Sequence, residues 1–512
     1  GGGGGGGGGA GKGKKKGADA PVQKLAVEPT PPLCPLQALR LAHIAANPLP
    51  PSAIRVCSYN ILCDQFCDAE WARQNLYAHC DRRWLDVEYR VPLLLRELQA
   101  YLPTLICLQE VEKRTWDTFL LPRFQTWGMD GWFSLKTKGS TWGCAIVWRQ
   151  DRLALRSSET QYLYDQTEWQ KYPVVAELCA ADSEVYASMK ACGTIAQFAV
   201  FDVLGSDGAV PETRSTLIAG NYHLFGNPEA PQIRIFQMAM MLWKMEALVG
   251  SAGEGGRGKL LLCGDANAEL GSGALDLALN RKVEASHVDF AEGLSFKNLA
   301  TRGARESLWN CKLSPEEMAA QEAVFKSVAG AEGIRGSLDF KKLERRLADA
   351  GLSAALAALA DVDERVQPAE ESHGRSYAWW FAWLKAVKVA TGPEAFPETL
   401  RALEAMACDA GCLRMSDGAE AGRGVLHSWG KELSHSLELS KRCDDVPASY
   451  WGASGSLVDF VLEGSFGTAN PPPLPTFPSF SPDAMHLTGG LPSQVCPSDH
   501  IPLLADILLP SQ

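Results

Sequence analysis

The segment KLLLCGDAN, residues 259–267, is an apolar run that ends at two polar residues, Asp265 and Asn267. Four other apolar runs also end at residues suited to phosphate or metal chemistry: 54–59 before Asn60, 105–109 before Glu110, 217–220 before Asn221 and His223, and 457–458 before Asp459. A sixth segment has the reverse order, since Ser498-Asp499-His500 precedes the apolar residues 501–504. If these runs are strands of one sheet system, their polar residues gather along a common rim.

Composition narrows the classes of protein and partner. The chain has 512 residues, 46% of them hydrophobic and 21% charged, which is enough for a large catalytic core with additions. Its net charge of -11 would repel nucleic acid overall, so a polyanionic substrate must be bound by local contacts with a metal ion and a few basic side chains. No apolar run approaches the roughly 18 residues of a membrane span, and we expect a cytoplasmic or nuclear protein without membrane association. The sequence opens on glycine and not on Met, so the presence of a targeting peptide stays open.

The 15 cysteines are scattered along the chain, and several, such as Cys57, Cys107 and Cys263, fall inside predicted strands. This pattern indicates free, buried thiols of a reducing compartment. The predicted rim contains carboxylates, carboxamides and imidazoles but no cysteine, which is the donor chemistry of a hard cation. We therefore expect Mg²⁺ as the cofactor, with Mn²⁺ as the alternative.

Four segments are distinguished by composition. Residues 1–51 are rich in Gly, Lys and Pro and are predicted to form a disordered tail. Residues 52–300 alternate strand patterns with amphipathic helices at 88–102 and 232–249, which predicts an α/β fold, a layered sandwich of two mixed β-sheets flanked by helices. Residues 301–445 are predicted to be a large, mostly helical insertion. Residues 446–512 are predicted to complete the sandwich.

The insertion has two features that bear on function. Residues 316–328 and 341–350 flank a loop in the manner of an EF-hand, but calcium binding is not expected because the ligand positions hold Ala331, Gly333, Arg335 and Lys342. We read this unit as a degenerate EF-hand-like hairpin. An aromatic cluster, Trp379, Trp380 and Trp383, is either buried core or a surface that docks a protein partner.

Five motifs in order resemble those of the endonuclease/exonuclease/phosphatase superfamily: SYNILCD at 58–64, ICLQEVE at 106–112, GCAIVW at 143–148, CGDAN at 263–267 and PSDHIPL at 497–503. They are most similar to the branch of carbon-catabolite-repressor-type deadenylases, nocturnin, Angel proteins and 2′,5′-phosphodiesterases. The resemblance covers residues 54–504 and leaves the tail and the insertion outside.

Four rim residues have expected roles around the ion and the attacking water, and the resemblance implies the same roles. Glu110 is expected to bind Mg²⁺ directly, and Asn60 to supply a neutral oxygen or to hydrogen-bond a water bound to the ion. Asp265 is expected to orient or deprotonate the attacking water. Asn267, two residues further along the same strand direction, would face the same side and donate to a phosphoryl oxygen.

The remaining rim residues are expected to stabilise the charge of the transition state or to bind substrate. His223 and His500 would donate to the phosphoryl oxygens, and Asp459 or Asp499 would orient His500. Asn221 and Pro228 are expected to contact the substrate, and Pro228 matches one half of the adenine clamp of the deadenylases. The aromatic half is missing from residues 454–460, so a preference for poly(A) stays open.

The leading hypothesis is a Mg²⁺-dependent 3′-5′ exoribonuclease of deadenylase type that hydrolyses RNA to 5′-nucleotides. A second hypothesis keeps the fold and replaces RNA by a small phosphoester such as 2′,5′-oligoadenylate, which the acidic net charge favours. A third hypothesis is a scaffold that docks a protein through the insertion and whose catalysis is vestigial. The number of metal ions, the oligomeric state and the role of the insertion stay open.

Overall fold

The computed structural model describes residues 31–69, 72–73, 76–181, 183–205, 208, 215–227, 230–251, 257–292, 432–442, 458–468, 473–478 and 491–510, with scattered residues between 338 and 407. The chain divides into two units, Gly1–Pro32 and Leu33–Gln512. The helices and strands that the structure describes all belong to the second unit.

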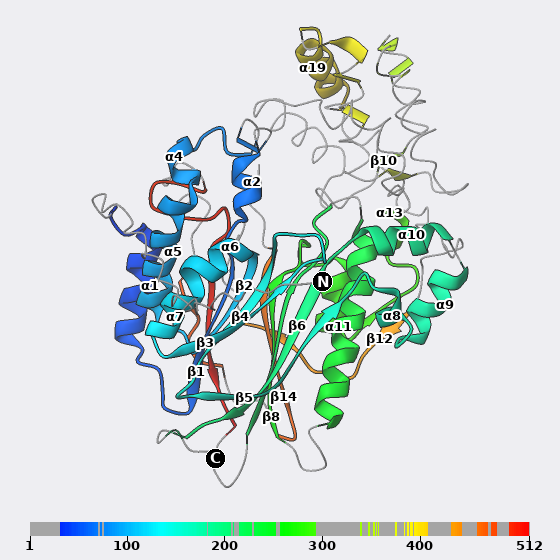
Figure 1. Cartoon of the computed structure of the whole chain (residues 1–512). Coiled ribbons are helices and arrows are strands. Elements are labelled where there is room, and N and C mark those ends of the chain that lie inside the picture. Colours follow the sequence, from blue (N-terminus) through cyan, green and yellow to red (C-terminus); the bar gives the residue numbers. More distant parts are fainter. Residues whose placement is uncertain are drawn as a thin grey trace, which may run out of the picture. The chain divides into compact units, whose positions relative to one another are not determined.

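Two mixed β-sheets form the centre of this unit (Figure 1). The five-stranded sheet has the order β15-β1-β2-β4-β3, with β15 at Leu503–Leu508, β1 at Ala53–Asn60, β2 at Leu105–Glu112, β4 at Trp142–Arg149 and β3 at Met129–Leu135. The six-stranded sheet has the order β13-β14-β8-β7-β6-β5, with β13 at Ser440–Lys441, β14 at Asp459–Phe466, β8 at Gly258–Asp265, β7 at Thr216–His223, β6 at Ile195–Val203 and β5 at Leu153–Tyr162. The pairs β1/β2 and β7/β8 are parallel and the other neighbours are antiparallel.

The two-residue period of each central strand divides its side chains between two apolar cores. In β8, Leu261 and Cys263 enter the core between the sheets, while Leu260 and Leu262 enter the core beneath the helices. Because both faces are covered, these strands read as continuous apolar runs in the sequence. The predicted α/β sandwich of two mixed sheets is confirmed.

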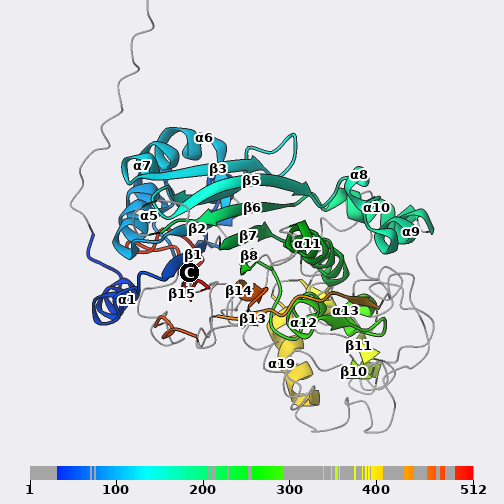
Figure 2. The same cartoon turned by 90° about the horizontal axis from the view of Figure 1, so that it is seen from below.

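Helices cover the outer face of each sheet (Figures 1 and 2). On the five-stranded sheet lie α5 at Val87–Tyr101, the π-helical turn η1 at Trp116–Leu120 and α7 at Leu121–Thr126. On the six-stranded sheet lie α11 at Pro231–Ser251 and α12 at Gly273–Asn280. A small group of helices joins β5 to β6, namely α8 at Gln166–Trp169, α9 at Pro173–Ala181 and α10 at Ser183–Ala191. The remaining short elements are α2 at Asp64–Asp68, α4 at Arg82–Leu85, α6 at Lys113–Thr115, β9 at Lys282–Val283 and α13 at Val288–Glu292.

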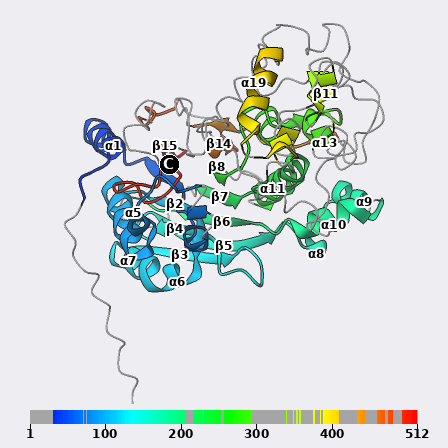
Figure 3. The same cartoon turned by 90° about the horizontal axis from the view of Figure 1, so that it is seen from above.

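The predicted disordered tail is wrong at its C-terminal end. Pro35–Ala46 forms helix α1, which lies beside α5 (Figure 3) and buries Leu36 and Arg40. Proline at the first helical position suits a helix start, because the amide it lacks would have no helical partner. The proline-rich flank concealed this short apolar stripe in the sequence.

The boundaries of the predicted insertion also need correction. Strand β12 at Leu433–Ser434 pairs with β9, and β13 then joins β14, so the chain returns to the sandwich before residue 446. Much of residues 301–431 lies outside the described part, including Trp379, Trp380 and the four ligand-position residues of the EF-hand-like loop. Within it the structure describes helix α19 at Phe396–Ala407 and one short antiparallel pair, β10 at Leu338–Asp339 with β11 at Gly374–Arg375.

Trp383 belongs to the buried part of the insertion. Its side chain is fully buried, and its indole N–H donates to the carbonyl of Ala355 at 3.0 Å. This residue therefore supports the core interpretation of the aromatic cluster.

Across the described ranges, no helix combines the length and the apolar character needed to cross a bilayer.

Candidate active site

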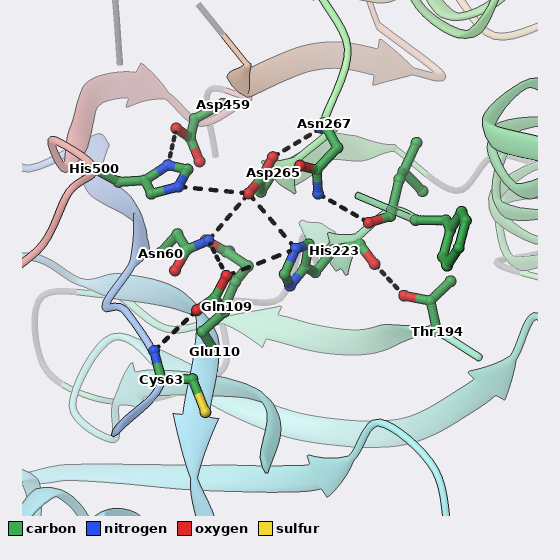
Figure 4. Close-up of polar contacts among 12 residues, drawn as sticks. Asn60, Cys63, Gln109, Glu110, Thr194, His223, Asp265, Asn267, Asp459 and His500 are labelled. Carbon is green, nitrogen blue, oxygen red and sulfur yellow. Dashed lines mark hydrogen bonds and ion pairs between the residues drawn. The ribbon is translucent and has the colours of Figure 1, made fainter. Parts of the chain in front are cut away.

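Both sheets contribute polar residues to one shared rim (Figure 4). The parallel pairing of β7 with β8 puts His223 opposite Asp265, and β1 brings Asn60 to the same end of the other sheet. Strand β14 runs antiparallel to β8, so its first residue, Asp459, pairs with the last residue of β8, Asp265. The prediction that a strand ends at Asp459 is therefore wrong, but the antiparallel direction brings Asp459 to the predicted rim.

Glu110 reaches the site through a backbone irregularity. The prediction that it ends a strand is wrong, since β2 continues to Glu112. The β2/β4 register shifts between Leu108 and Val111, and Glu110 has a left-handed φ of 57°. Such a bulge turns a side chain away from the alternation of the strand, and here it directs the carboxylate to the rim.

Asn60 links the carboxylates of the two sheets. Its amide nitrogen donates to Oε1 of Glu110 and to Oδ2 of Asp265, both at 3.0 Å, while its oxygen accepts from the N–H of Leu62 at 3.1 Å. The backbone N–H of Cys63 holds the second oxygen of Glu110 at 2.9 Å. The amide oxygen of Asn60 thus faces the backbone, in contrast to the predicted role as an oxygen donor to the ion.

His500 is oriented by Asp459. Nδ1 of His500 lies 2.7 Å from Oδ2 of Asp459, and its Nε2 faces Oδ2 of Asp265 at 3.8 Å. Asp499, the alternative partner in the prediction, accepts a hydrogen bond from the hydroxyl of Tyr77 at 2.8 Å. Of the two candidates, the geometry favours Asp459.

His223 faces the same carboxylates from the opposite side. Its Nε2 lies 3.6 Å from Oδ2 of Asp265 and 4.0 Å from Oε1 of Glu110. Its Nδ1 is buried and has no hydrogen-bond partner among the residues that the structure describes. Two imidazoles therefore flank Asp265, one on each side (Figure 4).

Burial and charge set the protonation of these groups. Burial and the nearby charge of Asp459 raise the pKa of Asp265 to about 7, and burial and the charge of Asp499 raise the pKa of Glu110. Burial disfavours a charged His500, but the carboxylates of Asp459, Asp265 and Asp499 together outweigh it and raise the pKa of His500 to about 10. Burial and the positive charge of Lys136 hold the pKa of His223 well below its usual value, which favours a neutral ring.

The donor chemistry of the rim suits a divalent cation. The carboxylate oxygens of Glu110 and Asp265 converge on one amide nitrogen, and both groups are buried, so a cation there would neutralise them. A second set, Asp265, Asp459 and His500, also places one donor atom each within 4.8 Å of the others. In that set His500 and Asp459 already bind each other at 2.7 Å, and a hard cation prefers oxygen, so we favour Glu110 as the ligand.

Asn267 and Asn221 differ from their predicted arrangements. The strand ends at Asp265, and Asn267 lies in the following turn with a left-handed φ of 48°. Its backbone N–H donates to Oδ1 of Asp265, and its side-chain amide donates to the carbonyl of Leu224 at 3.0 Å. Asn221 is fully buried between the sheets, where its amide donates to the carbonyls of Leu108 and Ala145 and accepts from Gln109. The predicted substrate contact of Asn221 is therefore wrong, because its hydrogen bonds join the sheets. Pro228 lies outside the described residues.

Three residues beside the rim, Lys136, Trp142 and Arg90, were not predicted as part of the site. Lys136 places Nζ 4.2 Å from the centroid of the Trp142 ring, which lies 5.7 Å from His223. Burial lowers the pKa of Lys136, although the carboxylate of Glu110 opposes this shift. Arg90 is buried and donates to the carbonyls that follow Asn60, and its only sequence signal is a charge on the apolar face of α5.

The fold and the rim define a class of protein in which two packed sheets share one buried site of carboxylates, amides and imidazoles. The chain belongs to the Endonuclease/Exonuclease/phosphatase family, whose model matches residues 57–331. The resemblance drawn from the five motifs is confirmed.

The curated relatives include a protein named as a 2′,5′-phosphodiesterase and a protein named as a subunit of the CCR4-NOT complex. Human 2′,5′-phosphodiesterase 12 is 26% identical over 239 residues, 46% of this chain and 37% of that protein. The CCR4-NOT transcription complex subunit 6-like-A of Xenopus laevis is 26% identical over 268 residues, 48% of this chain and 46% of that protein. The matched segment is thus less than half the length of these curated relatives.

Among solved structures, ANGEL2, named as a 2′,3′-cyclic phosphatase in complex with adenosine-2′,3′-vanadate, has a TM-score of 0.51 at 15% identity. The match covers 89% of this chain and 95% of that chain, and at this identity it supports the fold alone.

Proposed function

We propose that this chain is a Mg²⁺-dependent phosphodiesterase that removes nucleotides from the 3′ end of RNA. The observation that carries the proposal is the meeting of Glu110 and Asp265, buried carboxylates from opposite sheets, between two imidazoles. The relatives named 2′,5′-phosphodiesterase and CCR4-NOT subunit support hydrolysis of a phosphodiester bond.

Each residue at the rim has a role in the proposed reaction. A divalent cation held by Glu110 would neutralise phosphoryl oxygens and orient the scissile phosphate. Asp265 takes a proton from the attacking water, and Asn60 fixes the direction of that carboxylate through a 3.0 Å hydrogen bond. Water adds to phosphorus and the bond to the 3′ oxygen breaks. The shortened RNA leaves with that oxygen, which takes up a proton, and a 5′-nucleotide is released.

The two imidazoles stabilise the charge on the phosphoryl oxygens. His500, charged and fixed by Asp459, donates from Nε2, and the neutral His223 donates from the opposite side. Because these donors are held by the sheets before substrate arrives, they need little reorganisation during the reaction.

The test is hydrolysis of a 3′,5′-linked oligonucleotide with and without Mg²⁺, with the mass of each product identified. Asp265→Asn should lower kcat by roughly 10²–10⁴-fold, as expected for a lost base. Glu110→Gln should also lower kcat, because the charge that would hold the cation is removed. Glu88→Gln, an exposed acid on α5, is the matched control and should leave the rate unchanged. Turnover by both rim variants at the normal rate would overturn the assignment.

A second candidate substrate is a small phosphoester such as 2′,5′-oligoadenylate. The net charge of -11 disfavours long RNA, and the first relative is named for the 2′,5′ linkage. Rates on 2′,5′- and 3′,5′-linked oligoadenylates of equal length, compared at two salt concentrations, separate the candidates. If the substrate is long RNA, substrate binding should weaken steeply as the salt concentration rises. If the substrate is a small phosphoester, binding should change little.

A further inference from the structure

We propose that Phe66, backed by Trp142, forms a subsite that binds the nucleobase of a nucleotide. This inference rests on the proposed function and names an element of substrate recognition for the same site. The subsite is defined by Phe66, Trp142 and Lys136.

The position of Phe66 is fixed relative to Glu110. Phe66 lies on α2, directly after the loop whose Cys63 N–H holds Glu110 at 2.9 Å. Asp64 anchors the start of α2 through an ion pair with Arg90 and a hydrogen bond from Thr115 at 2.8 Å, while Cys67 is buried beneath it. The exposed ring is therefore carried by a segment that the site itself holds in place.

An aromatic row leads from the catalytic rim to this ring. The Trp142 ring lies 5.7 Å from His223, and the Phe66 ring meets Trp142 edge-on at 5.6 Å. Trp142 is largely buried, whereas Phe66 keeps 36% of its surface exposed. Edge-on packing against a buried indole leaves the Phe66 ring in a defined orientation with surface available for stacking.

The charge of the surroundings identifies the occupant as a nucleotide. The Nζ atom of Lys136 lies over the Trp142 ring at 4.2 Å, so an anionic group is favoured beside the aromatic row. A nucleotide carries its base one sugar away from its phosphate. The base would therefore lie on Phe66 while the phosphate lies near Lys136 and the rim. Bases stack on aromatic side chains with little regard to base identity, so the subsite would accept more than one base.

The test measures binding without turnover, using AMP and ribose 5-phosphate as probes in calorimetric titrations with Mg²⁺. The two probes share a phosphate and a sugar, so the ratio of their Kd values reports the base. Wild type should bind AMP roughly five- to 150-fold more tightly than ribose 5-phosphate, as expected for one stacking contact. Phe66→Leu should bring the ratio of the two Kd values close to one. Phe66→Tyr keeps the ring and should retain the preference.

Leu39→Ala, at an exposed apolar residue of α1, is the matched control and should leave the ratio unchanged. Equal binding of the two probes by wild type, no measurable binding of AMP, or an unchanged ratio in Phe66→Leu would each overturn the subsite. RNA hydrolysis is measured separately. A protein that cleaves no RNA but prefers AMP through Phe66 would overturn the exoribonuclease and support the subsite.

Discussion

Glu110 shows how a single backbone conformation positions a functional residue. A left-handed φ is uncommon for a residue with a side chain and costs of order 1–3 kcal/mol unless surrounding contacts compensate. Here the N–H of Cys63 and the amide of Asn60 bind the two carboxylate oxygens, and these bonds offset the cost. The strain thus brings the charge of β2 to the rim.

Asp459 is predicted to control the pH range of activity through His500. Against the effect of burial, Asp459 together with Asp265 and Asp499 raises the pKa of His500 to about 10, so loss of the Asp459 charge should lower that pKa. Since the charged ring is the proposed active form, wild-type kcat/KM should persist as pH rises and fall near pH 10. In Asp459→Asn the fall should move to lower pH, with roughly a 10²-fold loss where His500 has lost its charge, comparable to a lost oxyanion donor.

The measurement is the pH profile of kcat/KM through the neutral and alkaline range. Asp276→Asn is a matched control, because Asp276 faces a histidine, His287 at 3.4 Å, outside the site. Coincident alkaline limbs in wild type and Asp459→Asn would show that His500 does not act in its charged form.

At the scale of elements, helix α5 determines where two site loops lie. Arg90 on α5 donates to the carbonyls of Ile61 and Leu62 at 2.9 Å and of Pro497 at 3.0 Å. The first two follow Asn60 and the third precedes His500 by three residues. One buried guanidinium therefore connects the loops that carry both ends of the site.

Arg90→Lys should destabilise the sandwich and disturb the site together. An ammonium group lacks the planar fork that reaches several carbonyls at once, and each buried carbonyl left unpaired costs about 1–3 kcal/mol. Urea unfolding should report the lower free energy of unfolding, and kcat on the oligonucleotide should fall. Arg83→Lys, at an exposed ion pair, should change neither quantity. An unaltered unfolding midpoint in Arg90→Lys would show that the loops are held by other contacts.

At the scale of the whole second unit, polar side chains connect the two sheets across an apolar core. Asn221 of the six-stranded sheet donates to Leu108 and Ala145 of the five-stranded sheet, at 3.0 and 2.9 Å. A slip of either sheet would leave these buried groups unpaired, at a cost of about 1–3 kcal/mol for each group. The relative position of the sheets, and therefore of Glu110 and Asp265, is fixed by such contacts.

Removal of the insertion is predicted to leave the sandwich active. Strands β9 and β12 pair Val283 with Leu433, so the chain leaves and returns at neighbouring points. Replacing residues 293–431 by a short Gly/Ser linker should keep RNA hydrolysis within about threefold, since closing a shorter loop costs less entropy. A shuffled linker of equal length is the control. Failure of the shortened chain to fold would show that the insertion contributes to the core.

The sequence by itself determined the strands and the order of the site residues. Continuous apolar runs that end at Asn60, His223 and Asp265 predicted β1, β7 and β8, because burial on both faces is recorded in local composition. Parallel neighbours finish at the same edge of a sheet, so the approach of His223 on β7 to Asp265 on β8 is consistent with the pattern.

Only the tertiary structure decided which residues touch. The bulge at Glu110, the antiparallel start of β14 at Asp459 and the burial of Asn221 depend on partners far away in the chain. The same is true of Lys136 and Trp142 beside His223. Periodicity records which face of an element is buried, but the choice of contact depends on the packing of two sheets that local sequence does not encode.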